Sequence, residues 1–215
     1  MLSENRFSVE LARPTFVATR FFDAPSRLVF AALVEPEHLA RWSGPRDFMQ
    51  SVCEVDLWQG GIHRSVLRAP DGKELTFSGV YREVVPRERL VYTERFDVAP
   101  HSSHEHIVTI ALDERGGGTV LTLTERLRSL ENRRAKMKVG AWEADLHSLE
   151  RLAELVESMD STGGQDKADP QAALVGFECG EPAAAPERNS ARRQALERFA
   201  ALFGARPRAA PRHDG

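Results

Sequence analysis

The sequence predicts an α+β fold in which a curved antiparallel sheet of about seven strands packs against helices and encloses a cavity. Three observations support this. Short segments between Val55 and Phe96 alternate apolar and polar residues, as half-buried strands do. Turn residues separate these segments after a few positions, so neighbouring segments must pair in order. Further along, apolar residues recur every three or four positions, which is typical of an amphipathic helix.

The central meander is marked by its turns. Gly60-Gly61 indicates a tight bend, Ala69-Pro70-Asp71-Gly72-Lys73 a hairpin loop, and Pro86 the end of a strand. These breaks predict three strands, at Ile62–Leu67, Leu75–Val85 and Leu90–Phe96.

The segments before the meander predict one end of the sheet. Residues 1–12 are expected to be a loose lead-in, followed by a first strand over Thr15–Phe22. Asp23-Ala24-Pro25 then opens a helix, and Pro36 begins a second short helix that carries Leu39 and Trp42.

The segments on either side of the meander complete the sheet. Strands are expected over Phe48–Leu57, His104–Leu112 and Thr119–Glu125, with Gly116–Gly118 as a hairpin turn rather than a phosphate loop. One helix is then predicted from about Ser129 to Ser158, with an apolar stripe formed by Val139, Trp142, Leu146, Leu149, Leu152 and Val156.

Composition divides the chain into three parts. The lead-in (1–12) and the folded domain (13–159) precede a Gly-, Ala-, Pro- and Arg-rich tail (160–215). Two apolar islands interrupt this tail, at Ala173–Phe177 and at Ser190–Phe203, and residues 190–203 could form a helix. The tail is either mobile or loosely docked, or it carries a helix that binds a protein partner.

Charge and cysteine content exclude several classes of protein. A net charge of −3 over 215 residues lacks the basic excess that is typical of nucleic-acid-binding proteins. Cys53 and Cys179 lie far apart in unlike contexts, so a reducing compartment is expected. No apolar run reaches the roughly 18 residues of a membrane span, and the first residues lack a signal-peptide pattern. We therefore expect a cytoplasmic protein without a cofactor.

A series of motifs across residues 15–158 resembles the START-like SRPBCC superfamily, whose fold is called helix-grip. Within it, the chain is similar to the family named for the C-terminal domain of the activator of heat-shock protein 90 ATPase. The matching motifs are Phe21-Phe22-Asp23-Ala24-Pro25, Glu35-Pro36-Glu37-His38-Leu39-Ala40-Arg41-Trp42, Val55-Asp56-Leu57, Gly60-Gly61, Asp71-Gly72, Gly79-Val80-Tyr81-Arg82-Glu83-Val84-Val85-Pro86, Glu88-Arg89-Leu90-Val91, Gly117-Gly118-Thr119, and Trp142 with Leu146.

The resemblance implies a deep cavity between the sheet and the long helix, suited to a hydrophobic or amphipathic small molecule. Two positions depart from the family pattern. His63 stands where relatives usually carry an inward-pointing aromatic residue, and Trp58 stands where they often carry a charge.

Period-two alternation predicts which side chains face the cavity. The predicted ligand-binding residues are His63, Ser65, Leu67, Tyr81, Tyr92, Glu94, Phe96, His106, Val108, Ile110 and Leu123 from the strands, and Trp142 from the helix. The alternation also predicts that His63, Glu94, His106 and Glu125 converge beneath the helix.

That polar set allows several interpretations. Glu94 could pair with His63 or His106, so that buried polar groups satisfy one another and orient a ligand. Alternatively His63, Glu94 and His106 are catalytic candidates, as general acids and bases. A metal site is not expected: His101, His104 and His106 lie close in sequence, but the last two are two residues apart on an open strand and no cysteine joins them.

Two other features favour structural roles. Cys53 is expected to be hydrophobic filler, and the basic run Arg126–Lys138 the solvated start of the helix.

Three functions remain open on this basis. The first is binding of a small apolar or amphipathic ligand. The second is an acid–base enzyme, such as a polyketide cyclase or dehydratase. The third is a co-chaperone-like interaction protein, which would act through its surface.

Overall fold

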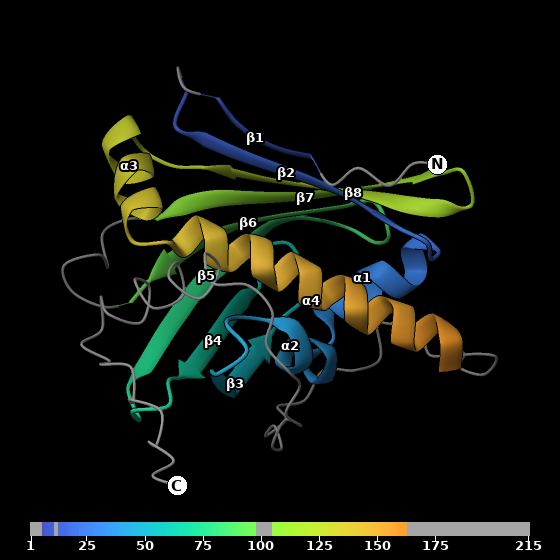
Figure 1. Ribbon diagram of the computed structural model, residues 1–215, viewed down its shortest axis with the longest axis horizontal. Coiled ribbons are helices and arrows are strands. Elements are labelled where there is room, and N and C mark those ends of the chain that lie inside the picture. The colour runs from blue at the N-terminus through green and yellow to red at the C-terminus, as the bar shows by residue number, and fades with distance from the viewer. Residues whose placement is uncertain (1–5, 11–12, 98–104, 163–215) are drawn as a thin grey trace, which may run out of the picture.

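The computed structural model describes residues 6–10, 13–97 and 105–162 (Figure 1). The elements of these residues are, in chain order, β1 (Arg6–Glu10), β2 (Thr15–Phe22), α1 (Ser26–Val34), α2 (Pro36–Trp42), β3 (Met49–Val55), β4 (Ile62–Arg68), β5 (Glu74–Val85), β6 (Arg89–Phe96), β7 (His106–Arg115), β8 (Gly118–Arg126), α3 (Leu130–Lys138) and α4 (Ala141–Thr162). The expected tail lies outside the described residues from position 163 on, including its two apolar islands.

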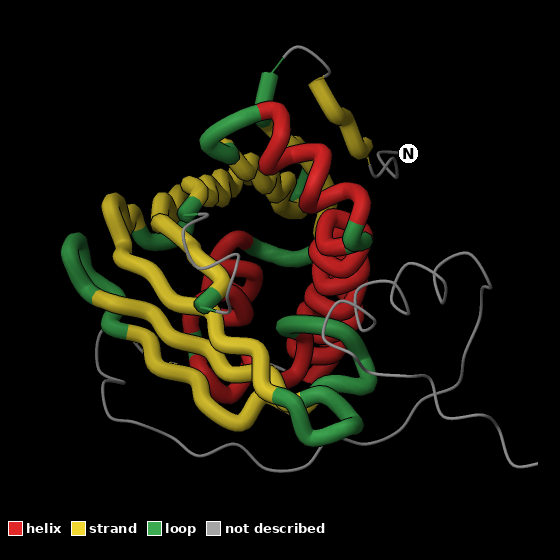
Figure 2. The backbone as a smooth tube through the Cα atoms, turned by 90° about the vertical axis from the view of Figure 1, so that its left-hand side faces the viewer, coloured by secondary structure: helices red, strands yellow, loops and turns green. Residues whose placement is uncertain are grey.

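The strands form one antiparallel sheet in the order β1-β2-β8-β7-β6-β5-β4-β3. The sheet curves, and the helices stand on its concave side (Figure 2). This confirms the predicted α+β helix-grip architecture. One strand was not predicted: residues 6–10, expected to be part of a loose lead-in, form β1 and pair with β2 from Arg6↔Thr19 to Glu10↔Thr15.

The turns between strands follow from local chemistry. In the β4–β5 hairpin Ala69 N–H donates to the Lys73 carbonyl at 2.8 Å, and Gly72 takes a φ of 86° that most side chains would oppose. The β7–β8 turn places Gly116 and Gly117 at φ 61° and 87°, as a tight hairpin between twisted strands requires.

Helices α1 and α2 close one end of the sheet and pack against α4. The indole Nε1 of Trp42 donates to the Ala32 carbonyl at 2.7 Å, which joins α2 to α1. From α4, the Arg151 guanidinium donates to the carbonyls of Gly44 and Arg41 at 2.7 and 2.5 Å. These bonds fix α4 across the opening of the curved sheet (Figure 1).

The predicted single helix over residues 129–158 is wrong in one respect, because it divides into α3 and α4. Ser129 caps α3 by accepting from the Asn132 N–H at 3.1 Å. Gly140 then takes a φ of 75°, which ends the first helix and redirects the chain into the second. The apolar stripe read across both helices therefore does not form one continuous face.

The main core lies between the sheet, α1 and α4, and a smaller cluster forms around Phe48, Leu67, Ala69 and Leu75. Among the described helices, none combines the length and apolar character needed to cross a membrane.

Candidate functional site

A cavity of about 330 Å³ lies between the concave face of the sheet and helices α2, α3 and α4. Small-molecule sites in proteins occupy roughly 300–1,000 Å³. The cavity is lined by eleven of the twelve predicted ligand-binding residues, namely His63, Ser65, Leu67, Tyr81, Tyr92, Glu94, Phe96, His106, Val108, Ile110 and Leu123.

Strand register explains why these side chains meet. Directly opposed residues of antiparallel strands point to the same face of a sheet. Tyr81 of β5 lies opposite Tyr92 of β6, Tyr92 opposite Val108 of β7, and Val108 opposite Glu125 of β8. This row crosses the cavity floor from one side to the other.

Much of the wall is apolar and aromatic. The rings of Phe77 and Phe96 lie 5.2 Å apart, and those of Tyr81 and Tyr92 lie 5.8 Å apart at a steep angle. Burial raises the pKa of both tyrosine hydroxyls, so they remain neutral at ordinary pH. A neutral hydroxyl can donate a hydrogen bond to a ligand.

His63 lines the cavity but does not pair with Glu94. Its Nε2 lies 2.9 Å from the carbonyl oxygen of Thr93, and since a carbonyl only accepts, this nitrogen carries the proton. Its ring also packs against Tyr81 and Tyr92, with centroids 5.6 and 5.0 Å away.

Glu94 lies instead beside His106. The residues face each other across β6 and β7, with Glu94 Oε1 3.6 Å from His106 Nε2. Of the predicted converging set, the structure therefore brings Glu94 to His106, and it holds His63 against the backbone of β6.

A buried ionic cluster continues from His106 to α3 and α4. The Lys136 ammonium lies 2.5 Å from Glu125 Oε2 and 2.8 Å from Asp145 Oδ2. Side-chain exposure is 5% for Glu125 and 14% for Lys136. The prediction that residues 126–138 are a solvated helix start is thus wrong for Lys136.

Lys136 and Asp145 were missed as site residues, although the sequence holds a signal for them. Asn132, Ala135, Lys136 and Val139 all line the cavity, and their spacing places them on one helical face. On α4, Ala141, Asp145 and Ser148 follow the same rule.

Trp142 is the predicted ligand-binding residue that the structure places elsewhere. It is 4% exposed and stacks on Phe16 of β2, with ring centroids 4.4 Å apart. The break at Gly140 gives α4 a different phase from α3, so Ala141 and Asp145 face the cavity and Trp142 faces the core.

Comparison with known families decides the membership of this chain. Residues 23–156 match the family described as activator of Hsp90 ATPase homolog 1-like protein. The chain belongs to this family. A comparison with curated proteins finds no match.

Solved structures of this fold come from several bacteria. A protein of Chromobacterium violaceum is 32% identical, with a TM-score of 0.57 over 67% of this chain and 97% of its own. A protein of Nitrosomonas europaea is 26% identical, with a TM-score of 0.62 over 71% and 99%. One of Rhodobacter sphaeroides, at 22% identity, shares the fold, with a TM-score of 0.64 over 72% and 99%.

In this member of the activator of Hsp90 ATPase homolog 1-like family, the ionic cluster shifts the pKa values of its members. Burial would raise the pKa of Glu125, but Lys136 and His106 hold it below its ordinary value. Burial, opposed by Lys136 and reinforced by Glu125 and Glu94, raises the pKa of Asp145 well above its ordinary value. The pKa of Lys136 is raised despite burial, because Asp145 and Glu125 stabilise its charge. Lys136 and Glu125 are therefore the ionised pair, and Asp145 keeps its proton to higher pH.

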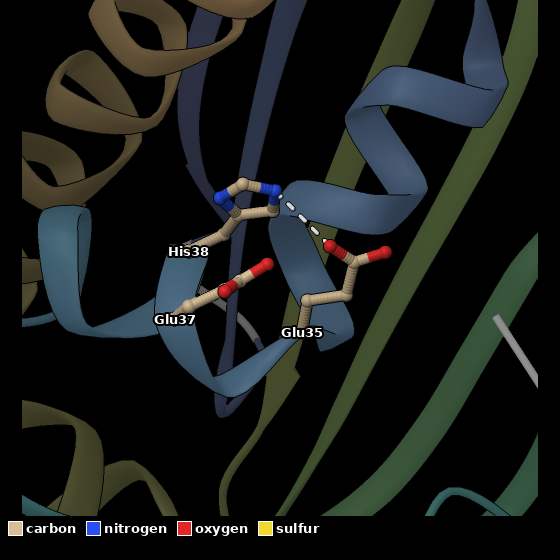
Figure 3. A group of neighbouring side chains, drawn as sticks. All are labelled: Glu35, Glu37 and His38. Atoms are coloured by element: carbon tan, nitrogen blue, oxygen red, sulfur yellow. Dashed lines mark ion pairs between the residues drawn. The ribbon is translucent and has the colours of Figure 1, made fainter. Parts of the chain in front are cut away.

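A second group of polar side chains lies at the start of α2, away from the cavity lining. Ligand-type atoms of Glu35, Glu37 and His38 lie within 4.8 Å of one another (Figure 3). The Glu35–His38 ion pair at 3.0 Å accounts for their closeness without a metal. Of the histidines considered earlier for a metal, His101 and His104 lie outside the described residues, and His106 is beside Glu94.

Proposed function

We propose that this protein binds a small apolar or amphipathic molecule in the cavity. One observation carries the proposal: a cavity of about 330 Å³ has a largely apolar and aromatic wall, with a group of ionisable side chains, Glu94, His106, Glu125, Lys136 and Asp145, on part of it. Membership of the family supports it, since a cavity that holds a ligand is general in this fold. The cysteine usage of the sequence supports a cytoplasmic location for the proposed binder.

The affinity would come chiefly from apolar area removed from water. Burying one methylene group contributes about 0.8 kcal/mol, so an alkyl chain in contact with Leu67, Phe77 and Phe96 gains affinity with each carbon. The polar groups would orient the molecule, since each hydrogen bond restricts which end enters which part of the cavity.

The proposal is tested by calorimetric titration with decanol, a neutral molecule with an alkyl chain and one hydroxyl. Val139→Trp should fill the cavity, because Val139 lines it at the end of α3. Lys138→Trp adds the same side chain at the neighbouring, exposed position and serves as the matched control.

Wild type and Lys138→Trp should bind one decanol with similar affinity, and Val139→Trp should lose at least about tenfold. Circular dichroism establishes that both variants are folded. The proposal would be contradicted if the wild type did not bind decanol, or if Val139→Trp and Lys138→Trp bound it with equal affinity.

A further inference from the structure

The polar region of the cavity contains more acidic than basic groups. We call it the acid-rich end and define it by Glu94, Glu125, Asp145, His106 and Lys136, all of which line the cavity. Three carboxyl groups here share one ammonium and one imidazole. The Lys136 ammonium is already engaged by Glu125 and Asp145, and Glu94 pairs, within the part of the chain that the structure describes, with the imidazole of His106.

The remaining charges of the cavity wall do not remove this excess. Glu54 is paired with Arg64 at 3.4 Å, and Glu105 with Arg82 at 3.9 Å. Arg128 also lines the cavity, but it is not among the main charges that shift Glu125 or Asp145. Even when the charge of Arg128 is counted with the acid-rich end, three carboxyls face two permanent cations, Lys136 and Arg128, so negative charge remains once all three ionise.

Two buried polar groups of the cavity wall also lack a full set of hydrogen bonds among the described residues. His106 Nε2 lies 3.6 Å from Glu94, which is beyond hydrogen-bond distance. Gln50 is only 4% exposed; its carboxamide bonds the Ser65 hydroxyl at 3.0 Å and leaves its other polar atom without a partner. Since an unpaired buried polar group is costly, both indicate a ligand that brings polar groups of its own.

Aromatic rings border the acid-rich end. Tyr92 and Glu94, two residues apart on β6, point to the same face of the sheet. Tyr81 of β5 lies directly opposite Tyr92. The faces of such rings attract cations.

From this arrangement we propose that the acid-rich end receives a cationic group, such as a protonated amine, of an amphipathic ligand whose apolar part fills the rest of the cavity. The cation would lie beside the carboxylates of Glu94 and Asp145 and near the ring of Tyr92. The inference rests on the proposed binding function and adds the chemical class of the ligand.

The protonation of Asp145 gives the proposal a second consequence. Groups from β6 (Tyr92, Glu94), β8 (Glu125) and α3 (Lys136) face this carboxyl, and His106 of β7 lies beside Glu94. Burial raises the pKa of Asp145 and the negative charges of Glu125 and Glu94 add to the rise, whereas Lys136 opposes it. A ligand cation bound beside Asp145 favours the ionised form of its carboxyl, so binding should release the proton of Asp145.

The experiment compares three probes that share one alkyl chain: decylamine, decanol and decanoate, each titrated into the full chain at neutral pH. The amine should bind roughly ten- to a hundredfold more tightly than decanol, which is the scale of a charge-assisted hydrogen bond. Decanoate should bind more weakly than decanol. For decylamine alone, the binding enthalpy should differ between phosphate and Tris buffers, because the released proton is taken up by the buffer.

Asp145→Asn and Glu94→Gln should each reduce the advantage of the amine about tenfold, and Asp145→Asn should abolish proton release. Decanol affinity is measured on each variant as the reference for that ratio, and circular dichroism establishes that the variants are folded. Glu143→Gln is the matched control, because Glu143 lies on the same helix as Asp145 but is exposed.

Each other outcome has a definite meaning. If decanol binds and the amine binds no better, the cavity function stands and the cationic ligand is excluded. Tighter binding of decanoate would likewise overturn the inference, in favour of Lys136 and His106 as the dominant charges. If none of the probes binds, the inference fails together with the proposed function.

Discussion

His63 connects its own strand, β4, to β6, which is not adjacent to β4 in the sheet. Its side chain leaves β4, passes over Gly79 of β5 and donates to the Thr93 carbonyl of β6. At the same place the Val80 N–H donates to the Thr93 hydroxyl at 3.2 Å, so side chains supply bonds between β5 and β6 close to the register shift, which lies between Tyr81 and Glu83. A phenylalanine at position 63 could not make this bond, because its ring carries no hydrogen-bond donor. The polar side chain at this position therefore supports the sheet as well as the cavity wall.

Gly79 is required because nothing larger fits beneath this bond. A Cβ there would come within 1.7 Å of the Thr93 carbonyl oxygen and 2.4 Å of His63 Nε2. Gly79→Ala should lower the free energy of unfolding by about 3 kcal/mol through overpacking. Urea denaturation measures this cost.

Gly72→Ala is the matched control, since a Cβ at Gly72 meets no atom within 4 Å and only the positive φ opposes it. That strain costs about 1 kcal/mol. Equal losses in the two variants would contradict the assigned role of Gly79.

At the scale of the elements, Lys136 joins α3 to β8 and α4. Lys136→Met would leave the buried Glu125 carboxylate without its cation, and removing one partner of a buried pair costs about 3–5 kcal/mol. Chemical denaturation should show this loss, and Glu125→Leu with Lys136→Met should recover much of it. A single variant as stable as the wild type would show that the cluster does not hold α3 in place.

The two carboxyls of this cluster make opposite contributions to the pH dependence of stability. The raised pKa of Asp145 means that the folded state binds its proton more tightly than the unfolded chain, in which aspartate titrates at about pH 3.9. Its contribution is complete below that pH and is lost as the pH rises through the folded-state value. Glu125, with a lowered pKa, contributes above its unfolded value and loses that contribution as the pH falls.

Asp145→Asn should therefore gain stability relative to the wild type as the pH is raised from about 4. Thermal denaturation across this range, with Glu143→Gln for comparison, measures the difference. A constant difference at every pH would contradict the raised pKa of Asp145.

The sequence predicts those parts of the fold that depend on neighbours in the chain. The turns at Ala69–Lys73 and Gly116–Gly118 follow from local backbone preferences, and the strands beside them alternate clearly. Strand β1 was missed because only its pairing with β2 makes it a strand. The break at Gly140 was missed because apolar residues on both sides continue a helical spacing.

In the candidate site, too, features set by the local chain could be predicted and features set by tertiary contacts could not. Strand parity placed Tyr92, Glu94 and Val108 at the cavity because the period of two is strict. Which polar groups pair was not predictable, since Lys136 meets Glu125 through the placement of α3, a tertiary contact. Trp142 was assigned to the cavity on the assumption of one continuous helix. The break at Gly140, which the sequence pattern does not show, changes which residues of α4 face the cavity.

At the scale of the whole molecule, the family match ends at residue 156, and the three solved structures described above cover 67–72% of this chain but 97–99% of their own. We therefore expect a chain ending at residue 162 to keep the thermal midpoint and the decanol affinity of the full chain. A drop of more than about 4 °C, the scale of 1 kcal/mol, would show that later residues contribute to the fold.

The most direct test of the ligand-filled cavity is native mass spectrometry of protein purified from its own host, followed by organic extraction. Wild type and Lys138→Trp should retain a small amphipathic molecule that Val139→Trp, with its cavity filled, lacks. Recovery of the same compounds from all three proteins, or of none from any of them, would contradict a cavity that stores a ligand.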